Sequence, residues 1–396
     1  MPAVIYIFSL CTFTFGLSEF VVAGLVSAIS LDLSESIAQV GSAIAAYALG
    51  AAIGAPVITA MLATWRDKTV LLLTLAVLAT GSVVISLAAD IVTLHGVRFV
   101  IGLAHGVFMA VASNAAVKLV DPLRAGRALS LVWIGLTLSI AFGVPIGTFF
   151  GSYWSWRMVF LAIGGLGLIS TLGLILLMRQ PPADALHKDL GLKQSLAALL
   201  QRELLMAASI AMLVSVATFS FFTFVSPFLL EITRVQPQVL SFAMLVFGVC
   251  SILGNVLGGY LADAFDADRC LLGGLSALMF NLLGLYVWGD SIIATLMLVG
   301  LLGVVFFAIV TLSTLRLLRL AHQHIPQSSA VASGLNIAAF NLGTALGGIG
   351  AGWVISQFGL AYIPIAGAGA ALVAMGVLGL QMNHVRLNNP CHPTVL

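Results

Sequence analysis

The chain has 396 residues, of which 61% are hydrophobic and only 8% are charged. Soluble globular domains carry roughly 25% charged residues, so this composition excludes a soluble protein and indicates a membrane protein. The formal net charge of +2 comes from basic residues spread along the chain in small groups, which gives no reason to expect a nucleic-acid partner.

Uncharged apolar runs long enough to cross a bilayer recur along the whole chain. A spanning helix needs about 20 residues, because the hydrocarbon is about 30 Å thick and a helix rises about 1.5 Å per residue. We expect twelve spans, at 4–27, 39–63, 70–89, 94–117, 128–152, 158–178, 204–229, 238–262, 271–288, 292–315, 329–356 and 360–382. The first is interpreted as a span and not as a cleaved signal peptide, because no basic residue precedes it and eleven similar runs follow. The sequence therefore predicts an all-α integral membrane protein in a lipid bilayer.

The first span contains the sequence FTFGLSEFVVAGLV (13–26), which places the carboxylate of Glu19 in the hydrocarbon. A charge at the bilayer centre costs from about 2.5 to more than about 10 kcal/mol, so such a residue faces the protein interior and marks a functional site. Phe15, Thr12 and Ala23 share its helix face, which predicts a cavity lining. The alternative is a structural glutamate held permanently by a hydrogen bond. Tyr47 in the second span is a weaker candidate for the same cavity.

The fourth span contains the other charge expected inside the membrane, Arg98, followed seven residues later by His105. Arg98 and Glu19 are both expected in the outer half of the bilayer, where they can meet. A nearby guanidinium favours the ionised carboxylate, whereas removal from water favours the protonated form. We therefore hypothesise that Glu19 exchanges a proton and that Arg98 is its fixed counter-charge. The alternatives are a static pair that holds spans one and four together and, for His105, a packed residue without a relay role. Asn114 in the same span is a weaker candidate for solute contact.

Small residues recur every four positions in the fifth and the eleventh span. They are Gly135, Ser139, Gly143, Gly147 and Gly151 in the former, and Ala339, Gly343, Gly347 and Ala351 in the latter. Such a stripe lets another helix approach closely and slide, although ordinary tight packing explains each glycine equally well. Pro145 lacks a backbone N–H and is expected to bend span five.

The longest polar segment, 179–203, separates spans six and seven and contains a Pro-Pro pair. It predicts a cytoplasmic central loop between an N-terminal six-helix bundle (1–178) and a C-terminal six-helix bundle with a short cytoplasmic tail (204–396). Two halves of six spans indicate parallel repeats with a solute site between them near the midplane.

Side chains that suit a solute-binding wall occur in the second half. Span seven contains ATFSFFTFVSPF (217–228), whose five phenylalanines point in several directions, and Phe222 is a candidate for the cavity wall. Asn336 and Asn341 in span eleven are buried amides, for which a helix-to-helix hydrogen bond is the alternative, and Asn255 in span eight is a weaker candidate. An apolar wall with a few amides and one acid suits moderately amphiphilic neutral or cationic small molecules.

The basic residues predict the orientation of the chain. With the N-terminus inside, only Arg157 and Arg234 fall in outside loops, whereas thirteen lysines and arginines fall on the inside. Both termini are therefore expected in the cytoplasm. The four cysteines form no C-x-x-C pair, and the sequence contains neither a metal-ligand spacing nor a nucleotide-binding loop. We expect no metal and no other cofactor.

Three stretches resemble motifs of the major facilitator superfamily. VRFVIGLAHGVF (97–108) resembles its fourth-helix R-x-x-x-G motif, GLTLSIAFGVPIGTFFG (135–151) its fifth-helix antiporter motif, and GGYLADAFDADR (258–269) its G-x-x-x-D…R loop signature. The first-half loop MLATWRDK (61–68) lacks the glycine and the leading aspartate of that signature. GLSEF, AHGVF and GLNIAAFNLGTALGG (334–348) are similar to the drug and sugar efflux branch, among the arabinose-efflux-like and chloramphenicol-resistance-like bacterial permeases.

This resemblance implies a fold of two pseudo-symmetric six-helix bundles and a monomer in the bacterial inner membrane. It also implies efflux of drug or sugar-like solutes coupled to inward proton flow, with Gly143, Pro145, Gly147, Asp263 and Arg269 in the conformational change. The main alternative is a proton-linked uptake carrier for a sugar or a nucleoside. A membrane-embedded enzyme is disfavoured because the spans lack a metal-ligand spacing, and a channel because no ring-forming charged or carbonyl-rich repeat occurs.

Overall fold

The computed structural model describes residues 1–121, 124–178, 201–324 and 329–388. Most of the predicted central loop at 179–203 and the last eight residues of the chain therefore lie outside the described residues. Within the described ranges the chain is helical and contains no strand. This is the expected outcome for a chain in hydrocarbon, because a helix satisfies every backbone polar group internally.

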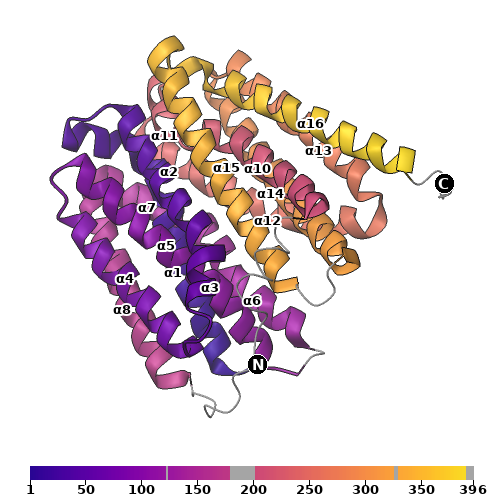
Figure 1. The fold of residues 1–396 in the computed structure, drawn as a ribbon. Helices are drawn as coiled ribbons and strands as arrows, with labels where there is room; N and C mark the ends of the chain where they lie inside the picture. The colour runs from indigo at the N-terminus through magenta and orange to yellow at the C-terminus, as the bar shows by residue number, and fades with distance from the viewer. Residues whose placement is uncertain (122–123, 179–200, 325–328, 389–396) are drawn as a thin grey trace.

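The helices fall into two groups that follow each other along the chain (Figure 1). The first group comprises α1 (Ala3–Leu33), α2 (Ile37–Ile53), η1 (Gly54–Ile58), α3 (Thr59–Met61), α4 (Asp67–Ser86), α5 (Ile91–Lys118), α6 (Ala125–Leu138), η3 (Ser139–Gly143), α7 (Val144–Phe150), η4 (Gly151–Ser155) and α8 (Trp156–Leu177). The second comprises α10 (Arg202–Phe222), α11 (Val225–Pro227), η6 (Phe228–Ile232), α12 (Pro237–Ala264), α13 (Ala267–Val287), α14 (Ile292–His324), α15 (Ser329–Phe358), η7 (Leu360–Tyr362) and α16 (Ile363–Asn388).

Eleven helical segments of the described chain are long and apolar enough to cross a membrane. One of them, Ala125–Leu177, has 53 residues, and a helix of that length would extend about 80 Å, far more than one bilayer. The backbone at Ser155 is extended, with φ −165° and ψ 132°, and its hydroxyl accepts a hydrogen bond from the Arg157 N–H. The chain therefore turns at Ser155, and this segment supplies two crossings. The prediction of twelve membrane helices is confirmed.

Side-chain caps fix where several helices begin. Ser36 and Gln39 form a reciprocal capping box at the start of α2, and Asp90 accepts a hydrogen bond from the Thr93 N–H at the start of α5. The backbone N–H and the hydroxyl of Thr93 also lower the pKa of Asp90. Caps of this kind satisfy donors that have no partner inside the helix. The cap at Asp90 fixes the start of α5, the helix that carries Arg98 and His105.

The two glycine stripes pack within their own halves. A Cβ on Gly147 would lie 2.7 Å from Val21 of α1, and one on Gly347 would lie 2.7 Å from the Val216 carbonyl of α10. Each stripe thus brings the fifth or the eleventh span close to the first span of the same half. Pro145 follows η3, where a π-helical turn interrupts the regular hydrogen-bond ladder.

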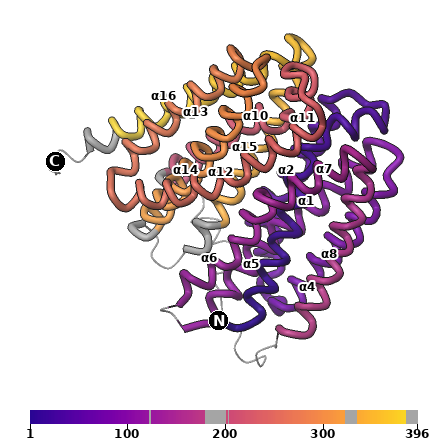
Figure 2. Tube along the Cα trace, turned by 180° about the vertical axis from the view of Figure 1, so that it is seen from behind, coloured from indigo at the N-terminus to yellow at the C-terminus, as the bar shows by residue number. Residues whose placement is uncertain are grey.

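The two halves contact each other along α2 and α15 and between α12 and the η3–α7 segment. Figure 2 shows this boundary from behind. A Cβ on Gly248 of α12 would lie 2.8 Å from the carbonyl carbon of Ile140 in η3, so the two backbones touch there. Ser226 of α11 donates a hydrogen bond of 3.3 Å to Ser27 of α1. These contacts hold the halves together toward the face opposite the N-terminus.

Candidate transport site

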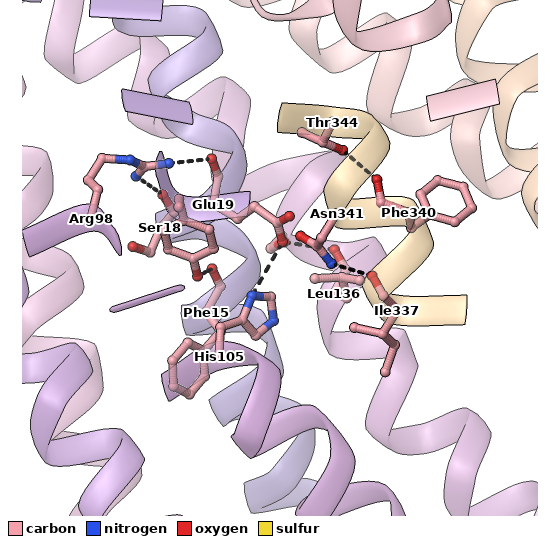
Figure 3. Close-up of polar contacts among 12 residues, drawn as sticks. Phe15, Ser18, Glu19, Arg98, His105, Leu136, Ile337, Phe340, Asn341 and Thr344 are labelled. Carbon is pink, nitrogen blue, oxygen red and sulfur yellow. Dashed lines mark hydrogen bonds and ion pairs between the residues drawn. The ribbon is translucent and has the colours of Figure 1, made fainter. Parts of the chain in front are cut away.

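Glu19 lies at the middle of α1, sixteen residues after Ala3. Its side chain is only 11% exposed, and one carboxylate oxygen is 3.5 Å from Nδ1 of His105 on α5 (Figure 3). α1 contacts helices of both halves, including α2, α5, α6 and α11. The acid therefore lies deep in the protein, about 24 Å from the start and about 21 Å from the end of the 31-residue α1.

Arg98 is completely buried and binds the main chain of two other helices. Its guanidinium donates to the carbonyl oxygens of Ala43 (2.9 Å) in α2 and of Ser18 (2.7 Å) and Glu19 (3.2 Å) in α1. It also lies over the ring of Tyr47, 4.6 Å from the centroid. The structure thus brings Arg98 to the peptide group of Glu19, while the carboxylate turns toward His105. Arg98 ties α1, α2 and α5 together and holds a positive charge beside the acid.

His105 lies in a box of aromatic side chains beside the acid. The ring of Phe15 stacks on it at 5.0 Å with an interplanar angle of 6°, and the ring of Tyr47 lies 5.7 Å away. The Tyr47 hydroxyl donates to the Phe15 carbonyl at 3.3 Å. Neither ring nitrogen of His105 has a hydrogen-bond partner within the described part of the chain. The imidazole therefore has the Glu19 carboxylate as a polar neighbour 3.5 Å away, somewhat beyond the range of about 2.6–3.2 Å for a direct proton-transfer contact.

The predicted asparagines occupy different environments. Asn336 Nδ2 donates to Thr314 Oγ1 of α14 at 2.9 Å, and Asn255 Oδ1 accepts from Thr311 of α14 at 3.0 Å, so both make helix-to-helix hydrogen bonds. Asn341 Nδ2 instead donates to the Ile337 carbonyl of its own helix at 2.9 Å. Asn114 is exposed, nine residues beyond His105 on α5. Of the four, Asn341 lies beside Glu19 in Figure 3.

An aromatic wall of the second half faces α1, and sequence reasoning identified little of it. Phe222 is buried against Phe247 at 4.4 Å and against Phe219 at 5.8 Å. Phe20 of α1 stacks on Phe219 at 6.2 Å, and Phe306 links Phe219 to Phe340. Sequence analysis selected Phe222 from the phenylalanine cluster of span seven. The rings of Phe20, Phe306 and Phe340 come from helices far apart in the chain, and the only sequence signals for them are that Phe20 follows Glu19 and that Phe340 precedes Asn341.

The charged groups predicted for the second-half loop form other contacts than the motif suggests. Asp263 is exposed and lies 3.9 Å from Arg319, while Arg269 is exposed and its backbone N–H bonds Asp266. The stronger tie is between Asp268 and Arg316, with Oδ1 and Nε 2.6 Å apart. Sequence reasoning missed this pair because Arg316 lies 48 residues further along the chain.

In the first half, a lysine at the end of the corresponding loop also makes polar contacts between two helices. Lys68 Nζ donates to the carbonyls of Ile175 (2.9 Å) and Met178 (2.6 Å) at the end of α8. A lysine that caps a helix C-terminus satisfies carbonyls that have no partner inside the helix. The degenerate loop 61–68 therefore still connects α4 to α8.

These features define a class of protein. Two six-helix groups form an all-helical membrane protein with one acid, one imidazole and one guanidinium gathered at the centre of the first group. Within the described residues, no cluster of three or more His, Cys, Asp or Glu residues could hold a metal ion. The arrangement is that of a membrane transporter built from two helical halves.

Comparison with known proteins identifies the family. A model of the Major Facilitator Superfamily matches residues 8–318. The inner membrane transport protein YdhP of Escherichia coli (strain K12) is 33% identical over 364 residues, which cover 92% of each chain. The chloramphenicol resistance protein of Streptomyces lividans is 31% identical over 365 residues, 89% of this chain and 92% of the relative.

The fold agrees with this family. A solved bacterial homologue of the human lysosomal transporter Spinster, in an inward-facing and occupied conformation, superposes with a TM-score of 0.75 and 16% identity over 96% of each chain. The chain belongs to the Major Facilitator Superfamily. It is a membrane transporter for small molecules and not an enzyme, and its relatives include a probable sugar efflux transporter of Helicobacter pylori (strain G27), 26% identical over 372 residues that cover 94% of this chain and 93% of the relative.

Proposed function

We propose that this transporter exports small organic molecules of the drug or sugar-like kind across the bacterial inner membrane in exchange for protons. The observation that carries the proposal is the Glu19 carboxylate at the middle of α1, 3.5 Å from His105 and 11% exposed. An ionisable group at that depth costs free energy, so its presence indicates a functional role. The name of the Streptomyces lividans relative supports the direction, because resistance to an antibiotic is what an exporter provides.

Glu19 is the proton carrier in this proposal. It accepts a proton from the outside-facing site and releases it to the cytoplasm-facing site. Removal from water favours the protonated form and the Arg98 guanidinium favours the ionised form, so a movement that changes these surroundings shifts Glu19 between proton binding and release. Arg98 stays bound to three carbonyls and supplies a fixed positive charge next to the acid. His105, whose Nδ1 is 3.5 Å from the carboxylate, is the residue proposed to pass the proton to or from Glu19.

The protonmotive force suffices for such an exchange. One proton that moves inward supplies about 1.4 kcal/mol per pH unit and about 2.3 kcal/mol per 100 mV. These amounts support a solute gradient of roughly ten-fold to several-hundred-fold. No nucleotide is required.

In this proposal, a relative movement of the two halves exposes the site alternately to the two sides of the membrane. Residues 1–178 and 204–396 rock against each other as bundles, with 179–203 as the cytoplasmic connection and both termini in the cytoplasm. Gly143, Pro145 and Gly147 lie in the segment of the first half that α12 contacts, and the ties at Asp263, Arg269 and Asp268 lie at the ends of helices in the second half. We infer that a monomer is sufficient, because both halves of the pathway lie in one chain.

The solute is proposed to bind between Glu19 and the aromatic wall. Phe222, Phe219 and Phe306 offer apolar surface, and Asn341 and Glu19 offer polar contacts. This combination suits an amphiphilic molecule with at least one hydrogen-bond donor. An uptake carrier for a sugar or a nucleoside is the second candidate, because the same site serves either direction.

Transport in membrane vesicles separates the two candidates. Everted and right-side-out vesicles are incubated with external labelled chloramphenicol or a labelled sugar analogue, and a pH step is imposed. Export predicts accumulation in everted vesicles with an acidic lumen, accompanied by loss of protons from the lumen. Accumulation only in right-side-out vesicles with an acidic exterior would instead support uptake. Flux without any response to the pH step would contradict both.

A further inference from the structure

The amide of Asn341 crosses from one half of the molecule toward the acid of the other. Figure 3 shows its side chain on α15 pointing toward the carboxyl group of Glu19 on α1. Its Oδ1 is buried and has no hydrogen-bond partner within the described residues, while its Nδ2 donates to the Ile337 carbonyl at 2.9 Å. An amide oxygen and a main-chain carbonyl oxygen are both acceptors without a hydrogen, so the atom facing the Ile337 carbonyl must be the amide nitrogen. The unpartnered atom on the other side of the amide is therefore an acceptor.

Only one protonation state of Glu19 satisfies that acceptor. An ionised carboxylate has only acceptor oxygens, whereas a protonated carboxyl group has one O–H donor. A buried acceptor without a donor is costly. The carboxyl group has two oxygens, of which one lies 3.5 Å from His105, so an O–H on the other is free to address Asn341.

The other described polar groups around Glu19 do not donate a hydrogen bond to Asn341 Oδ1. Each of the three nitrogens of the Arg98 guanidinium donates to a main-chain carbonyl, and the Tyr47 hydroxyl donates to the Phe15 carbonyl. His105 is the remaining titratable group beside the acid. Further charged groups on the elements packed against α1 lie at helix ends: Asp67 and Lys68 of α4, Lys118 of α5, Arg127 of α6, Arg157 of α8 and Asp263 of α12.

The surroundings of the pair are apolar. Phe20, next to Glu19, and Phe340, next to Asn341, belong to one chain of ring contacts through Phe219 and Phe306, with centroid distances of 6.2, 5.9 and 5.9 Å. These contacts connect α1 to the second half at the level of the acid. A hydrogen bond in such surroundings is stronger than one in water, and a missing one costs more.

We propose that Asn341 is the positioning residue that reads the protonation of Glu19 across the boundary between the halves. The protonated carboxyl group donates its O–H to Asn341 Oδ1 and stabilises the arrangement of the halves seen here. Loss of the proton to water removes this hydrogen bond and leaves two acceptors facing each other, which favours separation of α1 from α15. The inference rests on the proposed role of Glu19 as proton carrier and specifies how its proton acts on the second half.

Infrared difference spectroscopy on the full-length protein in lipid nanodiscs tests this contact with the proton itself as the probe. The C=O band of protonated Glu19 is identified by its loss in Glu19→Gln and is followed during a pH titration. A hydrogen bond of ordinary net strength predicts that Asn341→Leu lowers the apparent proton affinity of Glu19 about tenfold. The matched control is Asn281→Leu, because Asn281 also has an unpartnered Oδ1 and an Nδ2 bonded to a carbonyl, but pairs with Leu298 inside the second half.

Distances between spin labels on the two halves provide the second readout. The Glu19→Gln amide keeps a donor for Asn341 at every pH, so this variant is expected to hold the low-pH distance throughout, and Glu19→Gln combined with Asn341→Leu is expected to lose that hold. An unchanged proton affinity in Asn341→Leu, or an equal change in Asn281→Leu, would overturn the inference while leaving Glu19 as the carrier. The absence of any Glu19 band that responds to pH would instead overturn the proposed function.

Discussion

Replacing Gly248 with alanine tests whether the close approach of α12 to η3 holds the two halves in the arrangement described here. The new Cβ would lie 2.8 Å from the carbonyl carbon of Ile140 and closer still to the Ile140 oxygen and to Ala141 Cα. Ordinary van der Waals contact begins at 3.4 Å, so α12 must retreat by at least about 0.6 Å. All three neighbours are backbone or Cα atoms, and no side-chain rotation relieves the clash.

Overpacking of this kind costs about 1–3 kcal/mol, which corresponds to about a 5- to 150-fold change in the ratio of two conformations. Spin labels on Leu31→Cys and Ile293→Cys, in a background without the native cysteines, report the distance between the halves, since both sites are exposed. We expect Gly248→Ala to shift the distance distribution away from that of the parent protein. Gly259→Ala on the same helix is the control, because its Cβ would meet nothing within 4 Å. Identical distributions for Gly248→Ala and the parent would refute this role of the contact.

Two further substitutions test the ties that hold helices together. Arg98→Lys is expected to lower the free energy of unfolding by about 3 kcal/mol, because the three carbonyls accept from three different guanidinium nitrogens and a single ammonium nitrogen cannot occupy all three positions; each lost charged hydrogen bond is worth about 1.5–3 kcal/mol. Thermal unfolding measures the loss against the exposed Arg127→Lys, and equal midpoints would contradict the clamp. Asp268→Asn is expected to lower the free energy of unfolding by about 1 kcal/mol, since the ion pair of Asp268 with Arg316 is 2.6 Å long but partly exposed. Asp263 is 85% exposed, and Asp263→Asn should change the free energy of unfolding by less than about 0.5 kcal/mol. A larger effect at Asp263 would show that the loop motif, and not the Asp268–Arg316 pair, makes the connection.

The spans were predictable because hydrocarbon leaves the chain few options. Each backbone polar group must be satisfied within the segment, so length and apolar composition suffice to find a spanning helix. The break between the fifth and sixth spans at Ser155 was equally readable, since Ser155 and Arg157 interrupt the apolar run. Glu19, Arg98 and His105 were identified for a related reason, because a charge or an imidazole in such a segment has few explanations.

The directions of these side chains were not predictable. Helix spacing places Arg98 and His105 on one face of α5, but the packing of α1, α2 and α5 decides that the guanidinium reaches the main chain and that the carboxylate turns to His105. The aromatic wall and the contact at Gly248 depend in the same way on helices distant in sequence. A pattern within one helix carries no information about which residue of another helix it meets.

Proton movement driven by solute is the most direct test of the account. Purified protein is reconstituted into liposomes that contain a pH-sensitive dye, a gradient of labelled chloramphenicol is imposed, and the parent is compared with Glu19→Gln. We expect the parent to move protons against the solute flux and Glu19→Gln to move none, while solute exchange between equal pools continues in the variant. Proton movement in Glu19→Gln at the rate of the parent would contradict the role of Glu19 as the proton carrier.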